Sequence, residues 1–395
     1  MTRPLIAHID LAALSHNLGV ARVAAPNSRV LAVVKANGYG HGLGRVARAL
    51  RAADGYAVLA LEEAARLRSE GYSHPIVLLE GFFHSDELPE VARLHLRPVL
   101  HRQDQIETLV RARLEPRIDV LLKIDTGKHR LGLRPANVAG ALAALRASPH
   151  VASITLMSHF ACADDPTVGV ADQLAVFHTC LPPPASGTSS DLAAEVGQPS
   201  RMLGSSITGA ELPHPNPLPK GEGAYPICLA NSAAVLRYPD THGDWVRPGI
   251  MLYGISPFPG QIGADLGLLP VMTLESRLIA VQRIRRGEAV GYGACFVAER
   301  DLSVGVVACG YADGYPRHAD SGTPILVEGH LTRTLGRVSM DMLSVDLTPV
   351  PHAHVGSPVT LWGADLPAER VAAHAGTIAY ELLTALAPRV RVVEI

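Results

Sequence analysis

Short apolar runs alternate with stretches of helical periodicity over most of the first 250 residues, and this alternation constrains the fold more than any other feature. The predicted strands are 30–35, 56–60, 76–79, 96–100, 118–124, 154–158, 227–230 and 245–252. The predicted helices include 42–53, 62–70, 103–114 and 136–147. About eight such units in roughly 250 residues favour an α/β fold of the (β/α)8 barrel type over an open doubly wound sheet. Neither GxGxxG nor GxxxxGKS/T occurs to indicate the open sheet.

The repeated strand–helix pattern ends after residue 268. Short alternating strands are predicted at 274–282, 304–308, 323–327 and 357–361, with turn residues between them. A Pro- and Gly-rich stretch at 257–267 precedes them. The sequence therefore predicts a barrel domain at 1–268 and a mostly β domain at 269–395.

One segment fits neither domain. Residues 181–226 are dominated by Pro, Gly and Ser, including a Pro triplet at 182–184. Such a composition buries too little apolar surface to offset the entropy lost on ordering. We therefore expect an inserted, disordered surface excursion within the barrel domain, and a homologue whose activity the insertion has damaged stays an open alternative.

Composition excludes several classes of protein. The net charge is −2, and 18% of residues are charged against 48% hydrophobic, so no basic surface for nucleic acid is expected. No apolar run approaches the ~20 residues that cross a bilayer. The first 20 residues contain His8, Asp10 and His16, unlike a signal peptide, which favours a cytoplasmic location. Five cysteines without CxxC spacing indicate neither a disulfide framework nor a metal site.

Lysine is scarce, because the chain has only Lys35, Lys123, Lys128 and Lys220. Lys35 closes an apolar strand, so its amine should lie at the C-terminal mouth of the barrel, where barrel enzymes place their sites. Desolvation there lowers the pKa of an amine, and the neutral amine is the nucleophile that forms Schiff bases. A lysine at a strand edge followed by a Gly-rich turn is the alternative interpretation.

An ordered set of motifs resembles the pyridoxal-phosphate-dependent alanine racemases. Apart from residues 181–226, the resemblance covers nearly the whole chain. Its motifs are Ala32-Val-Val-Lys35-Ala-Asn-Gly-Tyr39-Gly-His-Gly, Lys123-Ile-Asp-Thr-Gly-Lys-His-Arg130-Leu-Gly, Met157-Ser-His159-Phe-Ala, Asn231-Ser232-Ala-Ala, Arg247-Pro-Gly249-Ile250-Met-Leu-Tyr-Gly, Gly291-Tyr292-Gly, Gly310-Tyr311-Ala-Asp-Gly-Tyr315-Pro-Arg and Arg337-Val-Ser-Met340-Asp341.

The resemblance implies an enzyme that interconverts L- and D-alanine by two-base proton transfer and supplies D-alanine for peptidoglycan. Lys35 would hold pyridoxal 5'-phosphate and move the α-proton on one face of the substrate, and Tyr292 would serve the other face. Inversion needs two bases, because one base that returns its own proton inverts nothing. A tyrosine with a pKa of ~10 is a poor base, and no neighbour of Tyr292 in the sequence identifies itself as its activator.

The resemblance also places Arg247 against the cofactor's pyridine nitrogen. An arginine cannot accept a proton there, which should suppress transamination and decarboxylation. An ion pair between Arg247 and Asp244 is the alternative. The resemblance assigns the remaining cofactor contacts to seven residues. His159 would stack on the cofactor ring, and Asn231, next to Ser232, would contact the cofactor as well. The phosphate would be bound by the backbone N–H groups of Gly249 and Ile250 and by the hydroxyls of Tyr39, Ser232 and Tyr380.

The resemblance implies that Arg130 forks onto the substrate carboxylate and that Met340 contacts the substrate through its main chain. Lys123 resembles a lysine that several family members carbamylate. An ion pair of Lys123 with Asp119 or Asp125 is equally open. The family often has methionine or glycine at the positions of Lys128 and His129, so this loop differs.

A homodimer with shared active sites is a further implication, since Tyr292 and Met340 come from the β domain. Three other functions stay open, besides a homologue whose activity the insertion has damaged. They are a racemase of basic or of many amino acids, a decarboxylase, and a non-catalytic pyridoxal-phosphate carrier. Arg247 counts against the decarboxylase, and the second domain counts against the carrier.

Overall fold

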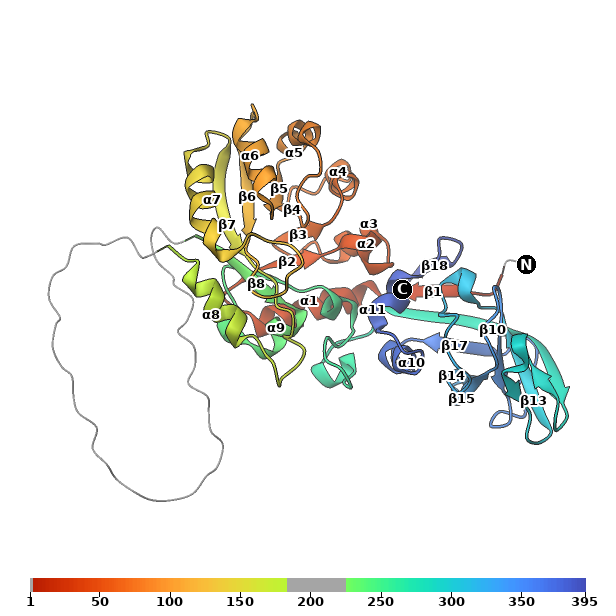
Figure 1. Ribbon diagram of the computed structural model, residues 1–395. Helices are drawn as coiled ribbons and strands as arrows, with labels where there is room; N and C mark the ends of the chain where they lie inside the picture. Colours follow the sequence, from red (N-terminus) through yellow and green to blue (C-terminus); the bar gives the residue numbers. More distant parts are fainter. Residues whose placement is uncertain (1–2, 183–224) are drawn as a thin grey trace, which may run out of the picture.

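The computed structural model describes residues 3–182 and 225–395 (Figure 1). The predicted insertion at 181–226 therefore lies almost wholly outside the described residues, as does Lys220. Among the described helices, none is long and apolar enough to cross a membrane.

Eight parallel strands close into a barrel, in the order β2 to β9. Burial is nearly continuous along most of these strands, β7 being the exception, because helices cover the outside while side chains fill the inside. The strands are β2 (Arg29–Val33), β3 (Gly55–Val58), β4 (Ile76–Leu78), β5 (Leu96–Leu100), β6 (Ile118–Lys123), β7 (Val151–Met157), β8 (Ile227–Asn231) and β9 (Trp245–Arg247).

Helices of the barrel domain lie on the outside of these strands (Figure 1). They are α1 (Leu11–Ala24), α2 (Lys35–Tyr39), α3 (Leu43–Ala49), α4 (Leu61–Ser69), α5 (Leu88–Arg93), α6 (Gln103–Arg111), α7 (Pro135–Ala147), α8 (Ala171–Thr179) and α9 (Ser232–Arg237). The barrel prediction is thus confirmed, with one local error. The predicted strand 245–252 stops at Arg247, and Ile250–Tyr253 form a 3-10 turn, η3.

The second part of the chain is built on an eight-stranded sheet in the order β13-β16-β15-β14-β17-β10-β1-β18. Its strands are β1 (Ile6–Ile9), β10 (Met272–Ile284), β13 (Leu302–Val307), β14 (Pro324–Val327), β15 (His330–Leu335), β16 (Leu343–Asp346), β17 (Pro358–Trp362) and β18 (Arg391–Glu394). A two-stranded hairpin pairs β11 (Ala289–Val290) with β12 (Phe296–Val297). The mostly β character predicted for this region is confirmed.

The N-terminal strand β1 (Ile6–Ile9) belongs to this second sheet. It pairs antiparallel with β10 and parallel with β18, so the first residues of the predicted barrel domain contribute to the other sheet. Figure 1 shows both termini at that sheet. The division near residue 268 stays a prediction, with this strand as an observed exception.

Two helices return from the second sheet to the barrel. They are α10 (Ala368–His374) and α11 (Ala379–Thr384), and α11 packs against α2 at the barrel mouth. The oxygen of Leu383 in α11 lies where a Cβ on Gly40 would project, at 2.0 Å, so Gly40 is needed for this close approach. The last segment of the chain thereby closes one side of the space above the barrel strands.

Candidate functional site

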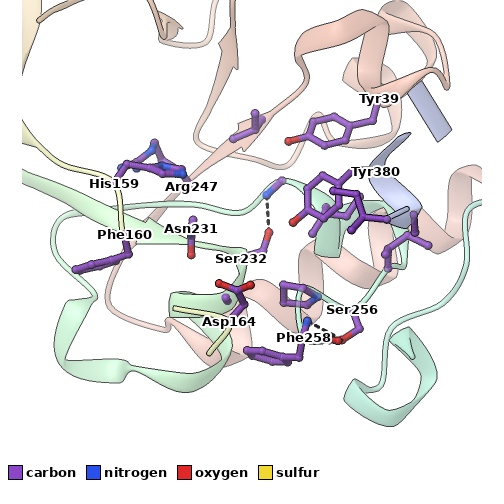
Figure 2. A pocket seen from close by; sticks show the side chains of 18 of the residues that line it. Tyr39, His159, Phe160, Asp164, Asn231, Ser232, Arg247, Ser256, Phe258 and Tyr380 are labelled. Carbon is purple, nitrogen blue, oxygen red and sulfur yellow. Dashed lines mark hydrogen bonds between the residues drawn. The ribbon is translucent and has the colours of Figure 1, made fainter. Parts of the chain in front are cut away.

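A cavity of about 1010 Å³ lies at the C-terminal ends of the barrel strands, with α10 and α11 on one side. Figure 2 shows side chains from the segment after β7 and from β8, β9 and α11 at this space, among them His159, Asn231, Arg247 and Tyr380. All but two of the expected site residues line it, namely Lys35, Tyr39, Lys123, Arg130, His159, Asn231, Ser232, Arg247, Gly249, Ile250 and Tyr380.

Lys35 begins an unusual left-handed turn. Ala36, Asn37, Gly38 and Tyr39 have φ angles of +54°, +54°, +62° and +50°, a conformation that costs non-glycine residues roughly 1–2 kcal/mol each. Such strain persists only where the surrounding structure fixes it, and it concentrates at functional sites. The turn sets both Lys35 and Tyr39 on the cavity wall.

The amine of Lys35 is made more nucleophilic by its surroundings. Partial burial lowers its pKa, and the nearby charge of Arg130 lowers it further, while Glu80 and Glu63 oppose the shift. A lowered pKa enlarges the neutral fraction of the amine at neutral pH, and only that form attacks a carbonyl.

Two tyrosines, Tyr39 and Tyr380, line one side of the cavity, and Tyr253 packs behind Tyr39. The Tyr39 ring stacks on Tyr253 with centroids 4.5 Å apart, and Tyr380 approaches Tyr39 at 6.3 Å. Burial raises the pKa of Tyr39 to about 12 and raises that of Tyr380 as well. Both phenols therefore stay protonated and can donate hydrogen bonds to an anion.

A small cradle of polar groups faces these phenols. The Ser232 hydroxyl accepts from the N–H of Gly249 at 2.9 Å and of Met251 at 3.4 Å, and its own proton is left to donate elsewhere. Asn231 accepts from Ala234 N at 3.1 Å and caps α9. Ser232, Gly249 and Ile250 thus lie together, whereas the side-chain oxygen of Asn231 has a structural partner.

Arg247 is buried and held from two sides by acceptors. Its Nη1 donates to the Cys228 carbonyl at 2.6 Å and contacts the Cys228 sulfur at 3.2 Å. Its Nη2 donates to the carbonyls of Ser158 and Leu229 at 2.8 and 3.1 Å. The alternative ion pair with Asp244 is not formed, because that carboxylate accepts from Ile227 N. Among the described residues no acceptor meets the Nε of Arg247.

His159 is kept neutral beside this cation. Burial lowers its pKa well below the ordinary value, and Arg247 lowers it further. The Nδ1 of His159 lies 3.3 Å from Nη2 of Arg247, so Nδ1 accepts and Nε2 carries the proton. A neutral imidazole at the edge of the cavity suits stacking on an aromatic ring.

Lys123 points into the barrel and has no carboxylate partner among the described residues. Asp119 pairs with Arg97 at 3.0 Å, and Asp125 accepts from His129, so neither alternative ion pair is formed. Burial lowers the pKa of Lys123 to about 8, with Arg247 and Arg130 adding to the effect. A substantial minority of the amine is therefore neutral near physiological pH.

Tyr292 and Met340 lie outside the cavity of their own chain. Tyr292 follows β11 in the hairpin and is 71% exposed, and Met340 is 53% exposed. A large exposed aromatic or apolar side chain without a cavity contact is consistent with a role toward another molecule. Within one chain, the structure leaves the second expected base apart from Lys35.

Four charged residues that line the cavity received no site role from the sequence. They are Glu80, Lys128, Asp164 and Glu369. Glu80 directly follows the predicted strand 76–79, so its place at the C-terminal end of a barrel strand was a usable signal. Lys128 lies in the loop that was already seen to differ from the family. Asp164 lies in a loop and Glu369 in α10, and nothing in the local sequence marks these two.

Comparison with known families matches the chain in two parts. The family described as "Alanine racemase, N-terminal domain" matches residues 9–187 and 218–257. The family described as "Alanine racemase, C-terminal domain" matches residues 271–394. The residues between 187 and 218 fall outside both matches.

Individual relatives are similar over their full lengths. An alanine racemase of Nitrosomonas europaea is 50% identical, with 100% of this chain and 99% of the relative covered. A catabolic alanine racemase of Klebsiella aerogenes is 48% identical over 100% of this chain and 99% of its own. Among solved structures, the biosynthetic alanine racemase of Pseudomonas aeruginosa gives a TM-score of 0.87 at 42% identity, with both chains fully covered. A Bartonella henselae alanine racemase with covalently bound pyridoxal phosphate gives 0.80 at 26% identity, again with full coverage.

Proposed function

The chain belongs to the alanine racemase family, and on that premise we propose that it is a pyridoxal-phosphate enzyme that interconverts L- and D-alanine. The observation that carries the proposal is that one cavity brings the expected residues together. It brings Lys35, Arg130 and Arg247 together at the mouth of the barrel with the tyrosine and glycine groups of a phosphate cradle. The similar enzyme of B. henselae holds the same cofactor covalently.

The donor set of the cavity fits pyridoxal phosphate. The protonated phenols of Tyr39 and Tyr380, the Ser232 hydroxyl and the N–H of Ile250 donate no hydrogen bond to any of the described residues. Donors of this kind at a turn suit a phosphate dianion. At the opposite end, the unpaired Nε of Arg247 suits a neutral ring nitrogen. We assign the phosphate to the cradle and the ring to the space between His159 and Arg247.

The cofactor, when bound, makes the α-proton of an amino acid acidic enough to move. In our proposal Lys35 binds the cofactor through its amine and afterwards holds or returns that proton at Nζ. The phenol of Tyr292 carries the proton on the opposite face. Arg130 orients the substrate through its carboxylate, and Arg247, which cannot take a proton, leaves the ring nitrogen unprotonated.

We propose that the second base comes from another copy of the chain in a homodimer. Tyr292 is exposed and lies outside its own cavity, so a partner's cavity is the place where it can face Lys35. Met340 is exposed as well, and we assign it to the same partner cavity. Each dimer would then contain two shared sites.

The test of the proposed cofactor site is chemical labelling. Purified protein loaded with pyridoxal phosphate should absorb visible light, and borohydride reduction should fix the cofactor to one peptide. We expect that peptide to contain Lys35. A label on Lys123 or Lys128, or the lack of any visible band, would remove Lys35 from the proposal.

Replacing Gly249 by alanine should weaken cofactor binding. The added Cβ would stand 2.6 Å from the Tyr39 hydroxyl, and the Tyr39 ring is stacked on Tyr253 and has little room to retreat. We expect the dissociation constant for pyridoxal phosphate to rise about tenfold, in keeping with the displacement of one or two hydrogen bonds. Titration of the apoprotein by absorbance measures this constant.

The matched control is Gly140→Ala in α7, where a Cβ would meet nothing within 4 Å. It should leave cofactor affinity unchanged and add slightly to helix stability. An equal loss of affinity in both variants would contradict the role assigned to Gly249.

Carbamylation of Lys123 is the next prediction. With a pKa of about 8, roughly half of the amine is neutral at pH 8, against under about 1% for an unperturbed lysine. The neutral amine can add carbon dioxide, and the resulting anion would face Arg130. We expect a carbamate signal with ¹³C-bicarbonate at pH 8 that fades as the pH falls below 7 and is lost in Lys123→Met. Its presence in that variant would assign the carbamate to another amine.

Two further points stay proposals. A role in supplying D-alanine for peptidoglycan would be supported if the gene rescued growth of a D-alanine auxotroph. A racemase acting on basic or many amino acids is the alternative, and a panel of L-amino acids followed by chiral chromatography separates it from an enzyme restricted to alanine.

A further inference from the structure

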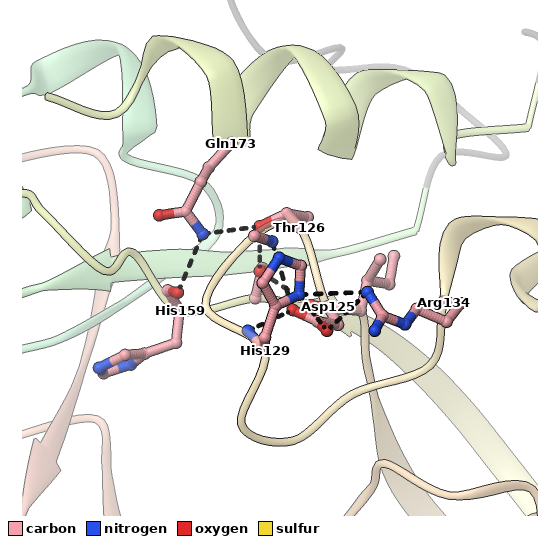
Figure 3. A network of polar contacts seen from close by, with 9 residues as sticks. Asp125, Thr126, His129, Arg134, His159 and Gln173 are labelled. Atoms are coloured by element: carbon pink, nitrogen blue, oxygen red, sulfur yellow. Dashed lines mark hydrogen bonds and ion pairs between the residues drawn. The ribbon is translucent and has the colours of Figure 1, made fainter. Parts of the chain in front are cut away.

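A polar network beside the cavity centres on Gln173 of α8 (Figure 3). Its Oε1 accepts from the N–H of Ala161 at 2.7 Å. Its Nε2 donates to the hydroxyl of Thr126 at 3.0 Å and to the carbonyl of His159 at 3.3 Å. Because the Ala161 N–H requires an oxygen opposite it, the orientation of the amide is fixed by its partners.

The hydroxyls next to Gln173 form a chain with one direction. Ser158 donates to the carbonyl of Ile124 at 2.9 Å, so its oxygen must accept from Thr126 at 2.8 Å. Thr126 has then used its single proton, and its oxygen can only accept from Gln173. The side-chain amide is therefore the one donor that completes this chain.

Each partner of the network leads to a group on the cavity wall. Thr126 begins the loop that carries Arg130, and that loop is closed by Asp125, which accepts from His129 N at 2.9 Å. The carbonyl of Ser158 holds Nη2 of Arg247. One side chain from an outer helix thus ties the loops after β6 and β7 to each other.

We propose that Gln173 is a positioning residue that fixes the positions of Arg130, His159 and Arg247 relative to one another. It touches none of the reacting atoms and acts through the backbone of the two loops. The assignment rests on the proposed function for what those three groups bind, but the network itself is a property of the chain alone. Gly127 in the same loop lies beside Gln173, since a Cβ added at this glycine would stand 3.4 Å from the Cγ of Gln173.

Two substitutions separate the role of the Gln173 amide as a donor from its role as an acceptor. Gln173→Leu removes both functions at similar volume. Gln173→Glu keeps the oxygen for Ala161 N–H but sets a second acceptor against Thr126 and the His159 carbonyl. For the glutamate variant to bond to Thr126, the Thr126 hydroxyl would have to turn away from Ser158.

With L-alanine as substrate, we expect Gln173→Leu to raise KM and the pyridoxal-phosphate dissociation constant about 5- to 10-fold each, while kcat changes less than about threefold. Gln173→Glu should match or exceed these changes. Thr126→Val should reproduce them in part, Thr126→Ser should restore the wild-type values, and Thr126→Val in the Gln173→Leu background should add less than a factor of about two.

A readout without cofactor keeps the inference independent of activity. In the apoprotein, amide hydrogen exchange at Ala161 should become about 5- to 10-fold faster in Gln173→Leu and stay near the wild-type rate in Gln173→Glu. The control is Gln103→Leu on α6, because Gln103 is exposed and, among the described residues, its side chain bonds only to Glu107, at 3.4 Å. It should change none of these quantities.

The outcomes distinguish the two proposals. If the wild-type protein fails to bind pyridoxal phosphate or to racemise alanine, the proposed function fails, and exchange at Ala161 still reports on the network. If wild type is active but the Gln173 variants match Gln103→Leu in KM, cofactor affinity and exchange, Gln173 is no positioning residue. A Gln173→Leu protein that does not fold leaves Gln173→Glu and Thr126→Val to decide in the same way.

Discussion

Replacing Lys35 by alanine is expected to lower the rate of alanine racemisation by at least about 10³-fold. The variant loses both the amine that holds the cofactor and the base on one face, and a positioned acid or base alone is worth about 10²–10⁴. The environment supports this role, since partial burial and Arg130 lower the pKa of the Lys35 amine. Initial rates of D-alanine formation measure the loss.

The fold should survive this substitution. Among the described residues, none forms a hydrogen bond or ion pair with the Lys35 side chain that its loss would leave unpaired, so the midpoint of thermal unfolding should move by only a few degrees. Added methylamine should restore part of the rate, because a small amine can enter the cavity left by the side chain. A variant that keeps more than a tenth of the wild-type rate would contradict the assignment.

Replacing Tyr292 by phenylalanine is expected to lower racemisation about 10³-fold as well, for a different reason. The variant keeps Lys35 and the whole cavity, so cofactor binding should be unchanged. It loses the base on the face of L-alanine that Lys35 does not serve. In deuterium oxide, exchange of the α-proton of L-alanine should be abolished, while D-alanine should still exchange through Lys35.

Mixing the two inactive variants tests whether Tyr292 acts on a partner's cavity. A mixed dimer has one site with an intact Lys35 from one copy and an intact Tyr292 from the other. Random exchange of subunits should therefore restore about a quarter of the wild-type activity. No recovery after exchange would place Tyr292 in the cavity of its own chain or outside the mechanism. Tyr238→Phe, which alters a half-buried tyrosine away from the cavity, is the control for loss of a phenol.

The barrel could be predicted from the sequence because most of its strands are buried along nearly their whole length. Runs such as 30–33 and 76–78 read as continuous apolar segments between helical stretches. The strand β1 was not predicted. It is only four residues long, and its partners β10 and β18 lie more than 260 and 380 residues away in the sequence, so no local pattern reveals the pairing.

The candidate site likewise contains residues that local sequence predicts and residues that it does not. Lys35 could be placed at the barrel mouth from the strand that precedes it, whereas Tyr380 was assigned by resemblance alone, since it reaches the cavity through the packing of α11 on α2. The left-handed turn after Lys35 was not predicted, because Ala36 and Asn37 adopt it under tertiary constraint. Gln173 carries no sequence signal, since each of its partners comes from another element.

The direct test of the central claim is the fate of L-alanine incubated with the purified protein and pyridoxal phosphate, followed by chiral chromatography. We expect L- and D-alanine to reach equal amounts, with one solvent deuteron incorporated at the α-carbon when the reaction runs in deuterium oxide. Unchanged L-alanine, or its conversion into pyruvate or an amine without D-alanine, would contradict the account.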